Sequence, residues 1–197
     1  MVNYYQWSHM SSYAGLVEVD NSENILSRFH RSPMGHKEVP DLAHWNPIQL
    51  VIFEGEKGYK RKTKGLGDFI SAGAANILSS RAVDCLSDIW EIYGDLYPVN
   101  VEEESDPYYI FHPKNVLDCL DRNRSNYETT QAGLISIVLD FVFLDNVVGD
   151  SLVFTIKELP DLPIYVSEVF KERVKKSKLR GLELNSKFFD LKPWKSG

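Results

Sequence analysis

A thiol and two carboxylates lie within four positions of one another in the segment NVLDCLDRNRS, residues 115–125. Asp118, Cys119 and Asp121 are residue types that serve enzymes as nucleophiles, general acids or general bases. A neighbouring carboxylate, however, raises the pKa of a thiol and so opposes formation of the thiolate that a cysteine nucleophile needs. The spacing therefore counts against Cys119 as a nucleophile.

The same segment has a simpler structural interpretation. Asn115, Asp118 and Asp121 alternate with apolar residues, and Asn and Asp commonly cap turns and short helical segments. Arg122 and Arg124 follow, and we predict that they pair with the two acids. We favour an ordered turn because no neighbouring motif supplies a substrate-binding element. An uncharacterised enzyme that uses Asp118, Cys119 or Asp121 in a pocket stays open as an alternative.

The glycines of GLGDFISAG, residues 65–73, match a dinucleotide-binding loop only in part. The motif G-x-G-x-x-G would require its third glycine at position 70, which is Ile70. No clear strand-to-helix turn surrounds these residues, and no GK[ST] element occurs in the chain. We therefore predict a flexible turn before the core, and no nucleotide cofactor.

Metal and disulfide chemistry find little support in the sequence. The five histidines are scattered without the short spacing of a local metal motif: His9, His30, His36, His44 and His112. Cys85 and Cys119 lie far apart and lack C-x-x-C spacing. We predict no metal, no cofactor and no disulfide, with Cys85 buried as a small hydrophobic residue.

The overall composition is that of an ordinary soluble globular protein, with 43% hydrophobic and 25% charged residues. A length of 197 residues suffices for a core of its own, so we predict a single domain over 1–197. The formal charge of −6 discourages general binding to nucleic acid or anionic lipid and favours a basic partner. The first residues lack the pattern of a secretory signal, which leads us to expect a cytoplasmic protein.

Hydrophobic periodicity predicts an α+β fold with a mixed, largely antiparallel sheet and two clear helices packed on it. Strands are predicted at residues 2–7, 48–53, 96–99, 107–111, 164–166 and 182–184. The apolar segments 133–144 and 151–156 flank a turn-bearing connection. This arrangement predicts that the two segments pair as long antiparallel strands.

The two predicted helices have recognisable ends. The first is predicted to start after Ser79 or the serine that follows it, and Gly94 is predicted to end it in a left-handed conformation. The second is predicted to start after Ser167, to bury Phe170 and to end at Gly181.

Two charged runs have ordinary interpretations. The basic residues of 171–180 gather toward the end of the second helix, where they complement the helix dipole on a solvated face. The acidic run EEESD, residues 102–106, is predicted to be a solvated turn between two strands.

The order and spacing of three segments in the last two thirds of the chain resemble those of a known protein family. They read DFISAGAANILSSRAVDCL from Asp68, YYIFHPKNVLDCLDRNRS from Tyr108 and VFTIKELPDLPIYVSEVFKERVKKSKLRGLEL from Val153, with a terminal Trp194. In this arrangement the chain resembles bacterial immunity proteins of polymorphic toxin systems, in particular immunity-protein family eleven. The resemblance covers about residues 68–194, and residues 1–60 carry little that matches.

The resemblance implies a cytosolic protein that binds a cognate toxin domain and neutralises it without catalysis. The positions that match the family pattern imply a scaffold role for Asn115, Asp118, Asp121, Ser125, Ser167, Phe170 and Gly181. An acidic loop suits a basic toxin surface and steers association. We therefore predict that the toxin contacts Glu102, Glu103, Glu104 and Asp106. A regulatory module with a different protein partner is a further alternative, and the oligomeric state stays open.

Overall fold

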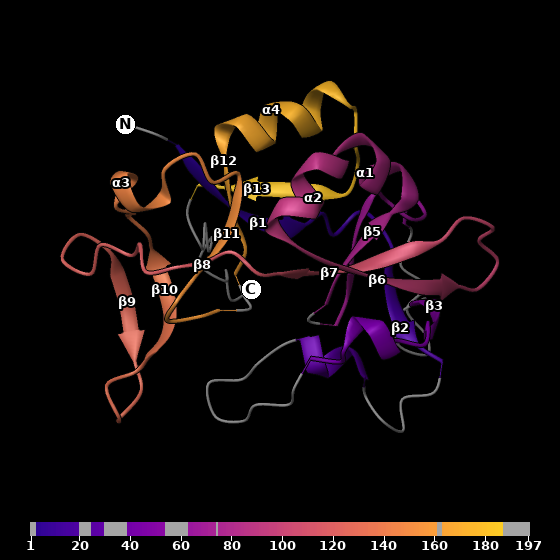
Figure 1. Ribbon diagram of the computed structural model, residues 1–197, viewed down its shortest axis with the longest axis horizontal. Helices are drawn as coiled ribbons and strands as arrows, with labels where there is room; N and C mark the ends of the chain where they lie inside the picture. Colours follow the sequence, from indigo (N-terminus) through magenta and orange to yellow (C-terminus); the bar gives the residue numbers. More distant parts are fainter. Residues whose placement is uncertain are drawn as a thin grey trace, which may run out of the picture.

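The computed structural model describes residues 3–19, 25–29, 39–53, 63–73, 75–160 and 163–186. It confirms the predicted α+β class, with helices packed on mixed sheets (Figure 1). Trp194, and the first residue of the strand predicted at 2–7, lie outside the described residues.

A six-stranded sheet forms one half of the molecule (Figure 1). Its strands, in the order β2-β3-β6-β7-β5-β4, are β2 (Gly15–Glu18), β3 (Gln49–Phe53), β6 (Gly94–Val101), β7 (Tyr108–Pro113), β5 (Ala75–Ser79) and β4 (Phe69–Ala72). All neighbours are antiparallel except β3 and β6. The sheet curves until its edge strands β2 and β4 lie beside each other, with Gly15 close to the Ser71 carbonyl.

A second sheet of five strands has the order β13-β1-β12-β11-β8. Its strands are β13 (Leu182–Asn185), β1 (Tyr4–His9), β12 (Tyr165–Ser167), β11 (Val153–Ile156) and β8 (Val116–Leu117). A separate hairpin consists of β9 (Asn126–Thr129) and β10 (Ile135–Asp140). The remaining elements are the 3-10 helices η1 (Ile25–Phe29) and η2 (Leu42–His44) and the helices α1 (Ser80–Cys85), α2 (Ser87–Tyr93), α3 (Asp145–Val148) and α4 (Glu168–Lys176).

Local capping explains where two of the helices begin. The Ser79 side chain accepts a 3.1 Å hydrogen bond from the Ala82 N–H at the start of α1. The Ser167 side chain accepts a 3.4 Å bond from the Phe170 N–H at the start of α4. Both predicted N-caps are confirmed. The helix predicted after Ser79 is divided at Leu86 into α1 and α2, whose shared apolar face packs into the core.

Trp7 on β1 stands at the centre of the core that joins the two large sheets. Its ring contacts Phe69 on β4, Phe111 on β7, Trp90 on α2 and Phe170 on α4. The opposite face of the curved sheet buries a second core, to which Leu16 on β2 and Leu50 on β3 contribute. A third core lies where α3 and β8 to β12 meet. The period-two alternation of the strands thus directs apolar residues of one sheet into two cores.

The pairing predicted for segments 133–144 and 151–156 is wrong. β10 pairs with β9, while β11 pairs with β12 and β8, and the connection between β10 and β11 contains α3. The sequence pattern identified apolar strands, but it does not specify partners, and the nearer strand β9 is available through a tight turn at Gly133.

Two glycines have roles other than the predicted ones. Gly94 is not left-handed but extended, and it opens β6 directly after α2. A Cβ at Gly94 would overlap the His112 carbonyl and the Phe111 ring, so close packing requires glycine there. Gly181 does not end α4, because Ser177 is the residue that caps it. Gly181 has a positive φ of 94° and lies against the Phe69 backbone.

Residues 65–73 were predicted as a flexible turn, and this is wrong for the second half of the segment. Phe69–Ala72 form the strand β4, which pairs antiparallel with β5, and no helix directly follows it. Phe69, Ile70 and Ala72 are buried. The run was misread because its apolar residues are interrupted by Ser and Gly, although both faces of the strand are covered.

Candidate functional site

The segment 115–125 is built into the second sheet. Asn115 donates a 2.9 Å hydrogen bond from its side-chain nitrogen to the Val153 carbonyl, and its own carbonyl accepts from Thr155 N–H at 2.9 Å. Val116 and Leu117 then pair in parallel with Thr155 and Ile156. Asn115 therefore fixes the register of β8 beside β11.

Asp121 organises the turn that follows. Its carboxylate accepts hydrogen bonds from the backbone N–H groups of Asn123, at 3.0 Å, and Arg124, at 3.2 Å. The Arg124 side chain lies 2.6 Å away, and these contacts lower the pKa of Asp121. Ser125 closes the turn by exchanging bonds with the backbone of Val142. The predicted ordered turn is confirmed for residues 121–125, whereas Val116 and Leu117, which were predicted to belong to it, form the strand β8.

Asp118 and Arg122 pair outside the segment, which corrects the prediction that both arginines pair with its acids. Arg122 binds Glu158 at 2.7 Å, and Asp118 lies 2.9 Å from Lys157. Both partners follow β11, so these pairs join the turn to the end of that strand. Only the Arg124 pair with Asp121 is local, as predicted.

Cys119 and Cys85 have opposite environments. Cys119 is buried, and desolvation, followed by the charges of Glu158 and Asp118, raises its pKa to about 12. The thiol therefore stays protonated at neutral pH and is a poor nucleophile. Cys85 is exposed at the end of α1, so its predicted burial is wrong. α1 ends at Cys85, and the next residue, Leu86, is buried in the core in its place.

No group of three or more His, Cys, Asp or Glu side chains that could hold a metal occurs in the part of the chain that the structure describes. His9 packs beside Trp7, and burial lowers its pKa to about 4. His44, at the end of η2, lies 2.8 Å from Asp41, which caps the start of η2. These two histidines therefore take part in local packing and capping.

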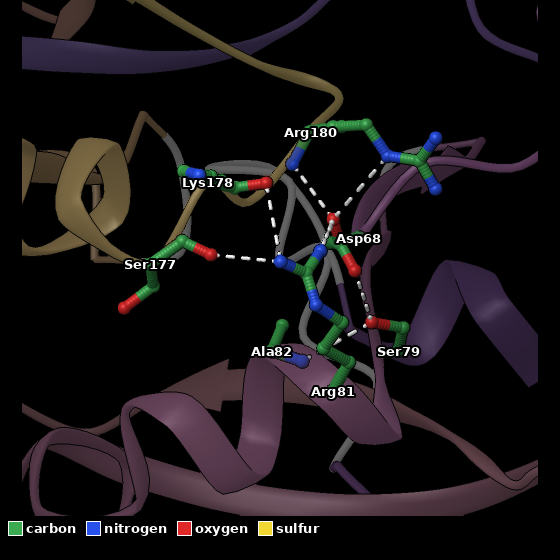
Figure 2. Close-up of polar contacts among 7 residues, drawn as sticks. All are labelled: Asp68, Ser79, Arg81, Ala82, Ser177, Lys178 and Arg180. Carbon is green, nitrogen blue, oxygen red and sulfur yellow. Dashed lines mark hydrogen bonds and ion pairs between the residues drawn. The ribbon is translucent and has the colours of Figure 1, made fainter.

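Asp68 is a buried carboxylate that the sequence analysis did not single out (Figure 2). Its oxygens accept from Ser79 at 3.0 Å, from Arg81 at 3.0 Å and from the Arg180 backbone N–H at 2.7 Å. Arg81 also donates to the Ser177 carbonyl at 2.7 Å. The cluster ties β4 and α1 to the loop after α4. Its sequence signal is weak, because its main partners are distant in the chain.

The remaining predicted scaffold positions lie at the start of α4 and just before β13. Ser167 caps α4, and Phe170 is fully buried against Trp7 and Trp90. A Cβ at Gly181 would overlap the Phe69 carbonyl oxygen. These three residues hold α4 and β13 against the core and present no reactive group.

The four acids predicted to bind a toxin lie in the loop of the β6–β7 hairpin, which projects from the molecule (Figure 1). All four side chains are exposed: Glu102, Glu103, Glu104 and Asp106. Glu103 adopts a left-handed φ of 67°, and the Glu104 N–H donates to the Val101 carbonyl at 3.1 Å. The hairpin and β8 lie on opposite sides of the view, so the acidic loop and the segment 115–125 do not form one site.

A second surface that the sequence analysis missed lies next to the acidic loop. β2 and β3 expose the large apolar side chains of Val17 and Phe53, and Val19, directly after β2, is exposed as well. The only sequence signal for β2 was the short run GLVEV, in a region dominated by Ser, Asn and Gly.

No helix in the described part of the chain is long and apolar enough to cross a membrane. The model of the Immunity protein family (Imm11) matches residues 98–187. The matched segment includes the acidic loop, the segment 115–125 and α4. A search of curated proteins found no match. Over residues 98–187 the chain therefore matches the immunity protein family Imm11, which its sequence resemblance indicated.

Proposed function

We propose that this chain is a cytoplasmic immunity protein of a bacterial toxin system, which binds a cognate toxin domain and neutralises it. The observation that carries the proposal is the match of residues 98–187 to an immunity protein family. The partner is then a toxin protein, and the chain acts as a single unit over 1–197. Its role is to occupy a toxin surface, without turnover of a substrate.

The chemistry of the segment 115–125 supports a role without catalysis. Its polar groups form bonds that hold the fold: Asn115 to β11, Asp121 to its own turn, and Arg122 to Glu158. The Cys119 thiol is buried and protonated. A group that is already bonded within the fold has little capacity left to act on a substrate.

The acidic loop supports a basic toxin as partner. Its four carboxylates are exposed on a projecting hairpin, and the chain carries a formal charge of −6. Exposed charge of one sign accelerates encounter with a surface of the opposite sign. The loop residues Glu102, Glu103, Glu104 and Asp106 are thus the proposed first contact.

Co-expression tests the proposed function. The C-terminal domain of the toxin encoded beside this chain is induced in cells with and without the full chain, and growth is measured. Protection by the wild type, together with a one-to-one complex in size-exclusion chromatography, is the expected result. A neighbouring product that is harmless on its own overturns the proposal.

Two variants separate immunity from the enzymatic alternative. Asp118→Asn and Cys119→Ser remove the groups that an enzyme would need. Because the proposal assigns neither a catalytic role, both variants should protect as well as the wild type when they are expressed at equal levels. Loss of protection by both variants, with folding intact, would favour the enzyme.

A further inference from the structure

Apolar side chains line the outer side of β2 and β3. In this antiparallel pair Val17 lies opposite Val51, and Gly15 lies opposite Phe53. Alternation places all four on the same side, and Val19, which bonds to the Gln49 carbonyl, continues the row. We call Val17, Val19, Val51 and Phe53 the β2–β3 outer face.

This face is exposed, and on the other side of the same two strands Ile52 also reaches the surface, at 37% exposure. Val19 is 57% and Phe53 49% exposed, whereas Leu16 and Leu50 on the other side are buried in the second core. The apolar side chains of the outer face therefore do not contribute to the second core. An exposed apolar group of this kind on a sheet is typical of a binding surface.

The β2–β3 outer face continues directly into the acidic loop. β3 and β6 are parallel, with Leu50 opposite Val101, and Glu102 donates its N–H to the Leu50 carbonyl at 2.9 Å. By the same alternation Val51 and Glu102 lie on the outer side of neighbouring strands. The apolar side chains thus have a cluster of carboxylates at one border.

We propose that the β2–β3 outer face and the acidic loop together form the docking surface for the toxin domain, a step that rests on the proposed function. The partner surface has an apolar centre that packs on Phe53 and Val17, bordered by Lys or Arg side chains that face the carboxylates. Interfaces commonly combine an apolar centre that excludes water with a charged rim that sets orientation and association rate.

Binding by matched variants tests this surface, with the toxin domain from the co-expression experiment as the probe. Phe53→Asp places a charge at the apolar centre and should weaken binding about tenfold or more. Ile92→Asp on α2 is the control, because Ile92 is 71% exposed and lies on a different element. Its affinity should stay within about twofold of the wild type. Phe53→Ala should weaken binding in the same direction without adding charge.

A second pair of variants tests the acidic loop. One variant neutralises the loop: E102Q, E103Q, E104Q and D106N. The control neutralises four exposed acids elsewhere: D84N, E91Q, E128Q and D150N. The loop variant should lower the association rate at low salt by about tenfold and weaken its salt dependence, because steering acts through the local field. The control should change the rate by less than about twofold, even though it removes the same charge.

The outcomes distinguish an error in the proposed docking surface from an error in the proposed function. If the wild type protects cells but Phe53→Asp and the loop variant both bind within about twofold of it, the docking surface is wrong and immunity stands. If the wild type fails to protect, both proposals fall. Light scattering of the chain alone detects a third outcome: a dimer that Phe53→Asp dissolves would assign the face to a second copy and overturn toxin docking. Circular dichroism confirms that each variant is folded.

Discussion

The carboxylate of Asp68, buried just before β4, accepts a 3.0 Å hydrogen bond from the half-exposed guanidinium of Arg81 on α1. The same carboxylate also accepts the N–H of Arg180 at 2.7 Å, so it connects two elements with the loop after α4. A buried carboxylate is stable only when its lone pairs are bonded in this way.

Asp68→Ala should lower the free energy of unfolding by about 3 kcal/mol, because it leaves the Arg180 N–H and Arg81 without their shared acceptor. Urea denaturation at neutral pH measures the loss. Asp118→Ala is the control: its pair with Lys157 is exposed on both sides, and the change should cost less than about 1 kcal/mol. Equal losses in the two variants would contradict a special role for Asp68.

The stability of the fold should depend on His9. Burial lowers the pKa of His9 from its ordinary value of 6.5 to about 4. Between these values the unfolded chain binds a proton that the folded chain excludes. The contribution of neutral His9 to the free energy of unfolding is thus fully present above pH 6.5. It falls as the pH drops toward 4, and the total loss amounts to about 2 to 3 kcal/mol.

His9→Gln removes this titration. The free energy of unfolding, measured in urea at pH 7 and pH 4.5, should fall less steeply with acid in the variant than in the wild type. The comparison between the two proteins cancels the contribution of the acidic residues, which both retain. Parallel pH profiles would show that the fold does not disfavour protonation of His9.

The two cysteines should differ in reactivity. Iodoacetamide at pH 8 should label exposed Cys85 in the native protein and leave Cys119 unlabelled, because burial raises the pKa of Cys119 to about 12. Mass spectrometry should find one label without urea and two with it. Cys85→Ser should abolish native labelling, and a label on native Cys119 would contradict its burial.

Local signals predicted the elements better than their arrangement. Ser79 and Ser167 were identified as caps because each bonds a backbone group within three residues. The pairs between Arg122 and Glu158 and between Asp68 and Arg180 depend on chain segments that only the tertiary fold brings together. The same limit applies to β10, whose apolar pattern says that it is a strand but not that it pairs with β9.

For the candidate site, too, the local features could be predicted from the sequence and the features that depend on strand pairing could not. The acidic loop was placed correctly in a turn between two strands, because charged residues flanked by apolar runs indicate a hairpin. The β2–β3 outer face could not be predicted, since β2 is only four residues long and its outward valines look like core residues in the sequence. Whether an apolar residue points inward depends on the register with β3.

Gly181 offers the sharpest test of how β13 is held. Its φ of 94° disfavours any residue with a Cβ, and a Cβ there would overlap the Phe69 carbonyl. Gly181→Ala should therefore lower the free energy of unfolding by about 3 kcal/mol or more, through strain and overlap together. Gly133→Ala is the matched control, because Gly133 also has a positive φ, 77°, but open space around it, so strain alone should cost about 1 kcal/mol. Thermal and urea unfolding measure the stability of both variants. Equal losses of unfolding free energy would mean that the close approach of Gly181 to β4 does not require a glycine. A larger loss in Gly181→Ala would confirm that glycine is required where β13 begins.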